Sequence, residues 1–247
     1  MTGDRLPIFW LTARQFLDGR SIRVVALLAA VPVLLGIIEI IATGSDLQIR
    51  NMLGQSFNEL TIPTLLPLIA LILSSSALGN EISDRTLPYL VLKPWSRFKV
   101  ICEKFGATVA TGAIITVTFG FVVWLMLGAI SSDLDGDLLL AIIVASALAI
   151  AAYSAAFTLL SLLLTRVLMA GLLYVLIWES LLARFIPGLR LLSIRHYAQS
   201  VYAHIIGDGS INIAQQSAMS TSLIVLAIVM LICLVLSWLR LQQMDLD

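Results

Sequence analysis

The sequence predicts an all-α protein, a polytopic membrane protein with six transmembrane helices. Hydrophobic residues make up 60% of the 247 residues and charged residues only 12%, with a mean hydropathy of +1.01. Soluble domains contain roughly 45–50% apolar and about 25% charged residues, so a water-soluble fold could not hide this much apolar surface. The apolar residues also form long blocks, and about 20 such residues in a row cross a bilayer as a helix.

Charge and cysteine content exclude several classes of protein. The formal net charge is zero and no basic tail or charge block occurs, so the chain lacks the footprint of a nucleic-acid-binding protein. Its two cysteines, Cys102 and Cys233, are isolated, which gives neither a disulfide framework nor a metal-ligand cluster. Both are expected to be small apolar fillers.

The first element is predicted to be an amphipathic interfacial helix at about residues 5–19. One face of this helix carries the apolar residues Leu6, Phe9, Trp10, Ala13, Phe16 and Leu17, and polar residues fall elsewhere. A cleaved signal peptide is the rival interpretation. The apolar stretch that follows, Val24 to Ala42, is too long for the core of a signal peptide, so we assign it to the first span.

Six apolar blocks are predicted to be the spans, at about residues 22–43, 60–78, 100–130, 138–164, 167–186 and 219–240. The division between the fourth and fifth spans depends on Thr165 and Arg166 alone. Residues 187–217 are expected outside, as a partly helical cap or a re-entrant hairpin. In the fourth span, small residues recur every four positions and predict close helix packing: Ala141, Ala145 and Ala149 on one stripe, and Ala147, Ala151 and Ala155 on another.

Lysine and arginine predict the orientation, because positively charged loops stay in the cytoplasm. With both termini in the cytoplasm, eleven of these residues fall inside and four fall outside. The loop 131–137 has three aspartates and no positive residue, as suits the outer side. We therefore expect a multi-pass protein of the plasma (cell) membrane with both termini cytoplasmic.

The sequence carries no recognisable catalytic or metal-binding motif. It has no phosphate-binding loop of the Walker type, no His-Glu-x-x-His and no Gly-x-Ser-x-Gly. Glu39 and Glu179 are ionisable groups inside apolar blocks, and such groups often mark intramembrane functional sites. Alternatively, they extend toward the interface, pair with an arginine such as Arg184, or accept hydrogen bonds within the bundle. His196 and His204 lack further ligands at metal-binding spacing, so packing or surface roles are expected.

A cytoplasmic segment at residues 80–97, here called the coupling segment, mixes charged and apolar residues. The segment contains a glutamate, a Thr-Leu pair, a further leucine, a proline, a small residue and an arginine, and a lysine follows it. These residues are Glu81, Thr86, Leu87, Leu90, Pro94, Ser96, Arg97 and Lys104. The segment resembles the one that links the second and third spans of ABC-2-type transporter permeases. It differs from that family at Arg85, where glycine is usual, and at Pro88, where a polar residue is common.

The resemblance implies a transmembrane permease subunit of an ATP-driven transporter, an exporter that works by alternating access. Such a subunit is not an enzyme and binds no cofactor, since ATP and Mg belong to a partner ATPase. Its implied partners are two cytoplasmic ABC ATPase subunits, a second permease that is a copy or a homologue, and the lipid bilayer. The implied ATPase contacts are Glu81, Asp84, Arg85, Thr86, Leu87, Tyr89, Leu90 and Arg97.

These residue types suit such a contact. Leu87, Tyr89 and Leu90 can fill an apolar groove, as interface anchors usually do, and the charged residues can form a polar rim. Ser96 is placed to cap the helix that enters the third span. Two alternatives of other classes are a membrane-embedded enzyme and a noncatalytic immunity or anchor protein.

Overall fold

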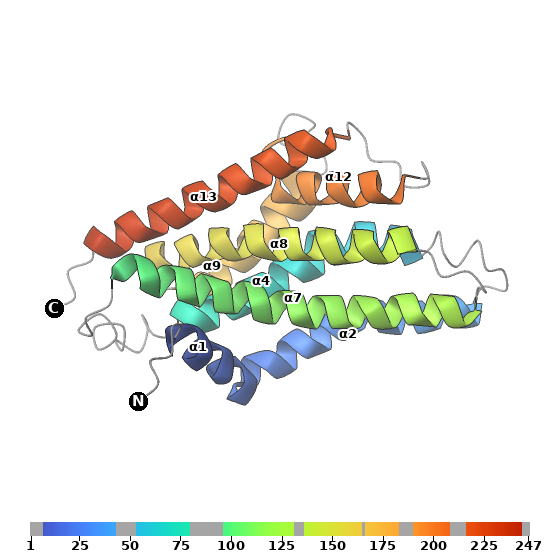
Figure 1. The fold of residues 1–247 in the computed structure, drawn as a ribbon, viewed down its shortest axis with the longest axis horizontal. Helices are drawn as coiled ribbons and strands as arrows, with labels where there is room; N and C mark the ends of the chain where they lie inside the picture. Colours follow the sequence, from blue (N-terminus) through green and yellow to red (C-terminus); the bar gives the residue numbers. More distant parts are fainter. Residues whose placement is uncertain are drawn as a thin grey trace.

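The structure is a computed structural model that describes residues 7–42, 53–79, 96–130, 136–164, 166–182, 190–207 and 216–243. Within these ranges the chain forms helices and no strand, which confirms the all-α prediction. Figure 1 shows the long helices side by side in an elongated bundle. In that view α1 and the last residues of α13 lie toward one end of the bundle, and α12 lies toward the other.

The amino-terminal part forms two helices that meet at a sharp corner. Helix α1 (Pro7–Asp18) corresponds to the predicted interfacial helix, and α2 (Arg20–Ala42) corresponds to the first span. Gly19 lies between them, and a Cβ there would come within 2.9 Å of the Gln15 carbonyl oxygen. Only glycine therefore fits this corner without a shift of the backbone.

The second span is a helix over residues 53–79 in which the hydrogen-bond register changes. It contains η1 (Phe57–Leu65), α4 (Leu66–Ser74) and η2 (Ser75–Gly79), of which η1 and η2 are π-helical. Pro63 lies inside η1 and has no backbone N–H. In an α-helix the Glu59 carbonyl would bind the N–H of residue 63, which proline lacks. In a π-helix the same carbonyl binds the N–H of residue 64 instead.

The remaining elements are α7 (Arg97–Ile130), α8 (Gly136–Leu163), α9 (Val167–Leu173), η3 (Tyr174–Leu182), α12 (Ile194–Ile206) and α13 (Met219–Gln243). Among the described residues, five helices are long and apolar enough to cross a membrane: Arg20–Ile41, Leu53–Gly79, Arg97–Ala129, Gly136–Leu163 and Met219–Gln243. The predicted span at 167–186 is seen as a shorter apolar helix, Val167–Glu179. These helices fit a membrane protein.

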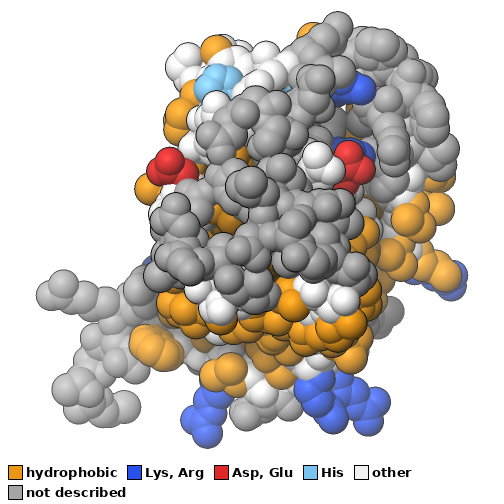
Figure 2. Space-filling view, turned by 90° about the vertical axis from the view of Figure 1, so that its right-hand side faces the viewer, with side chains coloured by type: hydrophobic (Ala, Val, Ile, Leu, Met, Phe, Trp, Pro, Cys, Tyr) orange, Lys and Arg blue, Asp and Glu red, His pale blue; other side chains and the backbone are white. Residues whose placement is uncertain are grey.

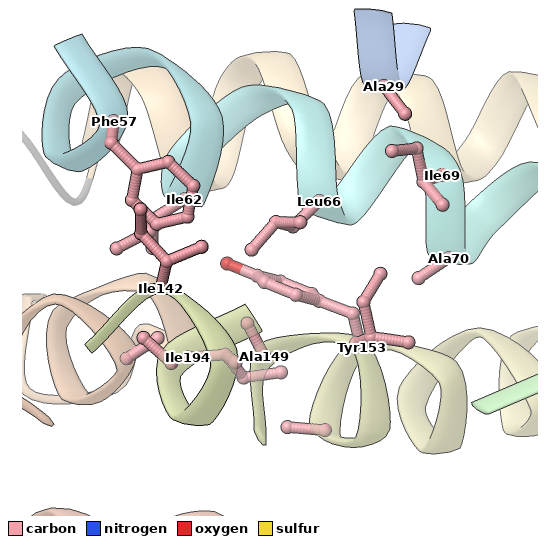
Figure 3. Packing of buried hydrophobic residues seen from close by; sticks show 14 of the residues in the cluster. Ala29, Phe57, Ile62, Leu66, Ile69, Ala70, Ile142, Ala149, Tyr153 and Ile194 are labelled. Atoms are coloured by element: carbon pink, nitrogen blue, oxygen red, sulfur yellow. The ribbon is translucent and has the colours of Figure 1, made fainter. Parts of the chain in front are cut away.

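Helix α8 lies at the centre of the bundle and packs against α4, α7, α12 and α13. Its stripe of Ala141, Ala145 and Ala149 is fully buried, as expected of small residues at close helix contacts. Figure 3 shows Tyr153 of α8 directed toward Leu66 in the second span. Figure 2 looks along the bundle and shows hydrophobic side chains on its flanks, where a bilayer would cover them.

Candidate functional site

The coupling segment lies largely outside the described residues, which resume at Ser96. Seven of its eight implied ATPase contacts fall in the undescribed part: Glu81, Asp84, Arg85, Thr86, Leu87, Tyr89 and Leu90. The structure does describe both ends of the segment, because η2 ends at Gly79 and α7 begins at Arg97. These two ends show what the segment is attached to.

Ser96 and Arg97 fix the start of α7. The Lys99 N–H donates to Ser96 Oγ at 3.3 Å, which confirms the predicted helix cap. Arg97 donates through Nη1 to the Leu241 carbonyl at 2.5 Å and to the Gln242 carbonyl at 3.1 Å. The last carbonyls of a helix have no partner within it, so Arg97 satisfies the end of α13. Arg97, which the resemblance placed among the ATPase contacts, is thus engaged within its own chain.

Lys104 holds the other end of the coupling segment. Its ammonium group is completely buried and donates to the Ala77 carbonyl at 2.5 Å. Ala77 lies in the last turn of η2, where carbonyls lack donors and carry the negative end of the helix dipole. The lysine that belongs to the permease-like pattern therefore ties α7 to the residues immediately before the coupling segment.

Glu103 is a functional candidate that sequence reasoning missed. It is only 4% exposed, and its Oε2 accepts the backbone N–H groups of Ile8 at 2.8 Å and Phe9 at 3.0 Å. Both groups belong to the first turn of α1, where backbone donors lack partners and the helix dipole favours a negative charge. The sequence did contain one indication of its role. Glu103 lies beside Lys104 near the start of an apolar span, and a charged group that becomes buried there needs hydrogen-bond partners.

Arg97, Glu103 and Lys104 together form what we call the α7 junction. Each charge has the sign that suits the helix end it meets: positive at the carboxyl ends of α13 and η2, and negative at the amino end of α1. Three elements, α1, η2 and α13, are thereby attached to the first two turns of α7.

Glu39 lines an open hollow at the far end of α2. Its Oε1 accepts a hydrogen bond from Ser56 Oγ at 2.6 Å. The hollow has a volume of about 390 Å³ and is lined by Leu35, Glu39, Gln55, Ser56, Glu59 and Leu60. Two acidic residues, Glu39 and Glu59, thus line one hollow.

Glu179 is completely buried in η3 and binds hydroxyl groups. Its Oε1 accepts from Tyr174 Oη at 3.1 Å, and its Oε2 accepts from Ser193 Oγ. Ser193 is the residue that precedes α12, so the carboxylate attaches the start of that helix to η3. Of the alternatives that the sequence left open for Glu179, a carboxylate that accepts hydrogen bonds within the bundle describes this geometry.

Two side chains of α12 connect the π-helical segments η3 and η1. Arg195 donates through Nη1 to the Glu179 carbonyl at 3.3 Å and through Nε to Gln199 Oε1 at 3.1 Å. Gln199 in turn donates to the Asn58 carbonyl at 2.6 Å. In π-helical register that carbonyl would need the N–H of residue 63, which is proline, so Gln199 supplies the missing donor.

We expect Glu179→Gln to leave the yield of folded protein near that of the wild type. The amide oxygen still accepts one hydroxyl hydrogen, and both hydroxyl groups can rotate. Glu179→Leu should instead lower the free energy of unfolding by about 1–3 kcal/mol, because it leaves buried hydroxyl groups unpaired. Thermal unfolding in detergent measures both effects. If Glu179→Gln has a normal yield but the protein loses its function, the carboxylate has a functional role.

The two histidines of α12 contact the residues just before α13: His196 is buried, whereas His204 is exposed. His196 Nε2 lies 3.0 Å from Ser217 Oγ, and His204 Nδ1 lies 2.8 Å from Gln216 Nε2. Burial, and to a smaller degree the charge of Arg190, lower the pKa of His196, which favours the neutral ring near pH 7. Within the part of the chain that the structure describes, no group of three His, Cys, Asp or Glu residues could hold a metal ion.

Comparison with known protein families shows which family the chain is similar to. The model of a family described as "Protein of unknown function (DUF2705)" matches residues 23–246, which is most of the chain and all of the predicted spans apart from the first residue of the first. No curated protein matches the sequence.

Proposed function

We propose that this chain, which belongs to the DUF2705 family, is the transmembrane permease subunit of an ATP-driven ABC exporter. The observation that carries the proposal is the α7 junction. The sequence pattern that resembles ABC-2-type permeases ends in Arg97 and Lys104. Lys104 ties η2, which precedes the coupling segment, to α7, which follows it, and Arg97 ties the end of α13 to the start of α7. A segment pushed by a separate ATPase would need such rigid attachments.

In this proposal, two ABC ATPase subunits bind ATP and Mg, and their closure displaces the coupling segment. Helix α7 passes the displacement to α1, η2 and α13 through the α7 junction, and the bundle changes between inward-facing and outward-facing states. The chain itself supplies no catalytic residue. It works with a second permease, as a copy or a homologue.

The proposed topology has six spans in the plasma membrane, with both termini and the coupling segment in the cytoplasm. The arrangement of the helices supports it, since α1, the end of α13 and the α7 junction lie toward the same end of the bundle (Figure 1). The fifth crossing in this topology, at about residues 167–186, contains α9 and η3. Residues 190–207, which contain α12, then lie outside.

The test is recovery of the ATPase with the purified permease. Leu87→Ala combined with Leu90→Ala should lower this recovery strongly, because truncation of a buried interface anchor commonly costs about 2 kcal/mol or more. A matched control is Ile224→Ala with Ile228→Ala, two exposed apolar residues on the flank of α13. This control should recover the ATPase as the wild type does.

Membrane insertion of each variant is checked in parallel. Equal recovery by the Leu87/Leu90 variant and the wild type would contradict the proposed contact. If no ATPase is recovered with the wild type, the exporter proposal fails, and the hollow with Glu39 and Glu59 becomes the site to examine for a membrane-embedded enzyme.

A further inference from the structure

Helix α1 has apolar side chains on two faces, and only one of these faces meets the bundle. Ile8 and Phe16 lie on the side that packs against the rest of the chain, and both are almost completely buried. Trp10 and Leu17 lie on the opposite side and are 66% and 67% exposed. The apolar face predicted from the sequence contained Trp10, Phe16 and Leu17 together. Packing divides it and leaves one part uncovered by the residues that the structure describes.

Helix α2 has an exposed stripe that begins with an arginine and continues with apolar side chains. The exposed residues recur at helical spacing: Arg20, Val24, Leu27, Leu34, Ile38 and Ile41. The apolar part, from Val24 to Ile41, is about 26 Å long at 1.5 Å per residue, close to the roughly 30 Å of the hydrocarbon layer. Arg20 and its exposed neighbour Arg23 therefore lie where lipid chains end and headgroups begin.

The corner between α1 and α2 brings these two surfaces together at Gly19. Figure 1 shows this corner at the edge of the bundle, away from α8 and α13. Residues 7–27 contain three arginines and one acidic residue, Asp18, so their net charge is +2. Tryptophan favours the level of the headgroups, and an apolar helix face with basic neighbours binds best to a negatively charged lipid surface.

We propose that this corner binds the headgroups of anionic phospholipids. Arg20 and Arg23 pair with the negative headgroup, because a guanidinium group matches the geometry of a phosphate. Trp10 and Leu17 enter the layer just below the headgroups, so α1 lies on the bilayer with its uncovered face in lipid. The occupant is lipid because the corner continues the apolar stripe of α2 and its charge is opposite to that of the headgroup. The proposal requires only that α2 spans a membrane, and it is independent of any ATPase.

Native mass spectrometry of the purified full chain in detergent measures the affinity for the first bound lipid. The two probes are phosphatidylglycerol, which is anionic, and phosphatidylcholine, which is zwitterionic. Each arginine near an anionic surface contributes about 1 kcal/mol, which is about fivefold in affinity. Arg20→Gln with Arg23→Gln should therefore weaken phosphatidylglycerol binding by about 30-fold and change phosphatidylcholine binding little.

A charge-matched control is Arg166→Gln with Arg240→Gln, since both of these arginines are exposed and lie outside the corner. This control should keep the preference of the wild type for phosphatidylglycerol. Trp10→Ser with Leu17→Ser should weaken the binding of both lipids by similar factors, because it removes apolar contacts and no charge. The Tm of each variant should match that of the wild type, because all of these side chains are exposed.

Three results would overturn the proposal. The first is equal affinity of the wild type for the two lipids. The second is a preference for phosphatidylglycerol that survives Arg20→Gln with Arg23→Gln. The third is a dimer of the wild type that Trp10→Ser with Leu17→Ser dissociates, which would show that a second copy of the chain covers the corner.

Discussion

Replacing Glu103 with alanine should detach the amino-terminal end of α1 from the bundle. The change removes the acceptor of the Ile8 and Phe9 N–H groups, which are bound at 2.8 and 3.0 Å. Hydrogen bonds to a charged group contribute roughly 1.5–3 kcal/mol each, so the expected loss is about 3 kcal/mol or more. Hydrogen exchange of the peptide that contains Ile8 and Phe9, measured in nanodiscs by mass spectrometry, should become more than 100-fold faster.

Two further variants separate the backbone contact from the charge. Lys99 lies 3.5 Å from the other oxygen of Glu103 but is 39% exposed, so Lys99→Ala should change exchange little. Glu103→Gln keeps one acceptor oxygen without the charge and should give an intermediate rate. Unchanged exchange at Ile8 and Phe9 in Glu103→Ala would show that α1 is held by other contacts.

Gly171→Ala should be the most destabilising change of a single methyl group in α9. A Cβ at Gly171 would lie 2.2 Å from Cδ1, 2.8 Å from Cδ2 and 3.1 Å from Cγ of Leu71. Leu71 is itself buried in the core, so its side chain has no free space to enter. Overpacking of this kind costs about 1–3 kcal/mol or more, and the Tm in detergent should fall by roughly 2–4 °C for each kcal/mol.

The chain offers a matched control and a rescue for this variant. Gly136 has no atom within 4 Å of an added Cβ, so Gly136→Ala should leave the Tm nearly unchanged. Leu71→Ala alone should destabilise by about 2–5 kcal/mol through the cavity it creates. Combined with Gly171→Ala it should cost less than the sum of the two, because the added methyl group occupies that space. Additive effects would mean that the two residues do not meet.

Hydrophobic blocks were sufficient to predict most of the helices. Helices α2, α7, α8 and α13 each begin and end within a few residues of the predicted spans, because long apolar blocks leave little choice of structure in lipid. The predicted fifth span is less complete, since its described part is a shorter apolar helix that becomes π-helical at Tyr174. The spacing of hydrophobic side chains does not predict where an α-helix changes to π-helical hydrogen bonding.

The candidate site was less predictable than the fold. The pattern drew attention to Arg97 and Lys104, but their partners are carbonyl groups, which look the same at every position of a sequence. Gln199 was not singled out for the same reason, since its partner is the Asn58 carbonyl 141 residues away. The contacts predicted for Leu87, Tyr89 and Leu90 stay predictions, because these residues lie outside the described part.

The attachment of α1 through Glu103 also sets an order of events during biosynthesis. Ile8 leaves the ribosome long before its acceptor, which follows 95 residues later, and translation adds about 5–20 residues per second. For roughly 5–20 seconds the first turn of α1 therefore lacks its Glu103 acceptor. A nascent chain arrested before residue 103 should therefore carry α1 in an undocked position.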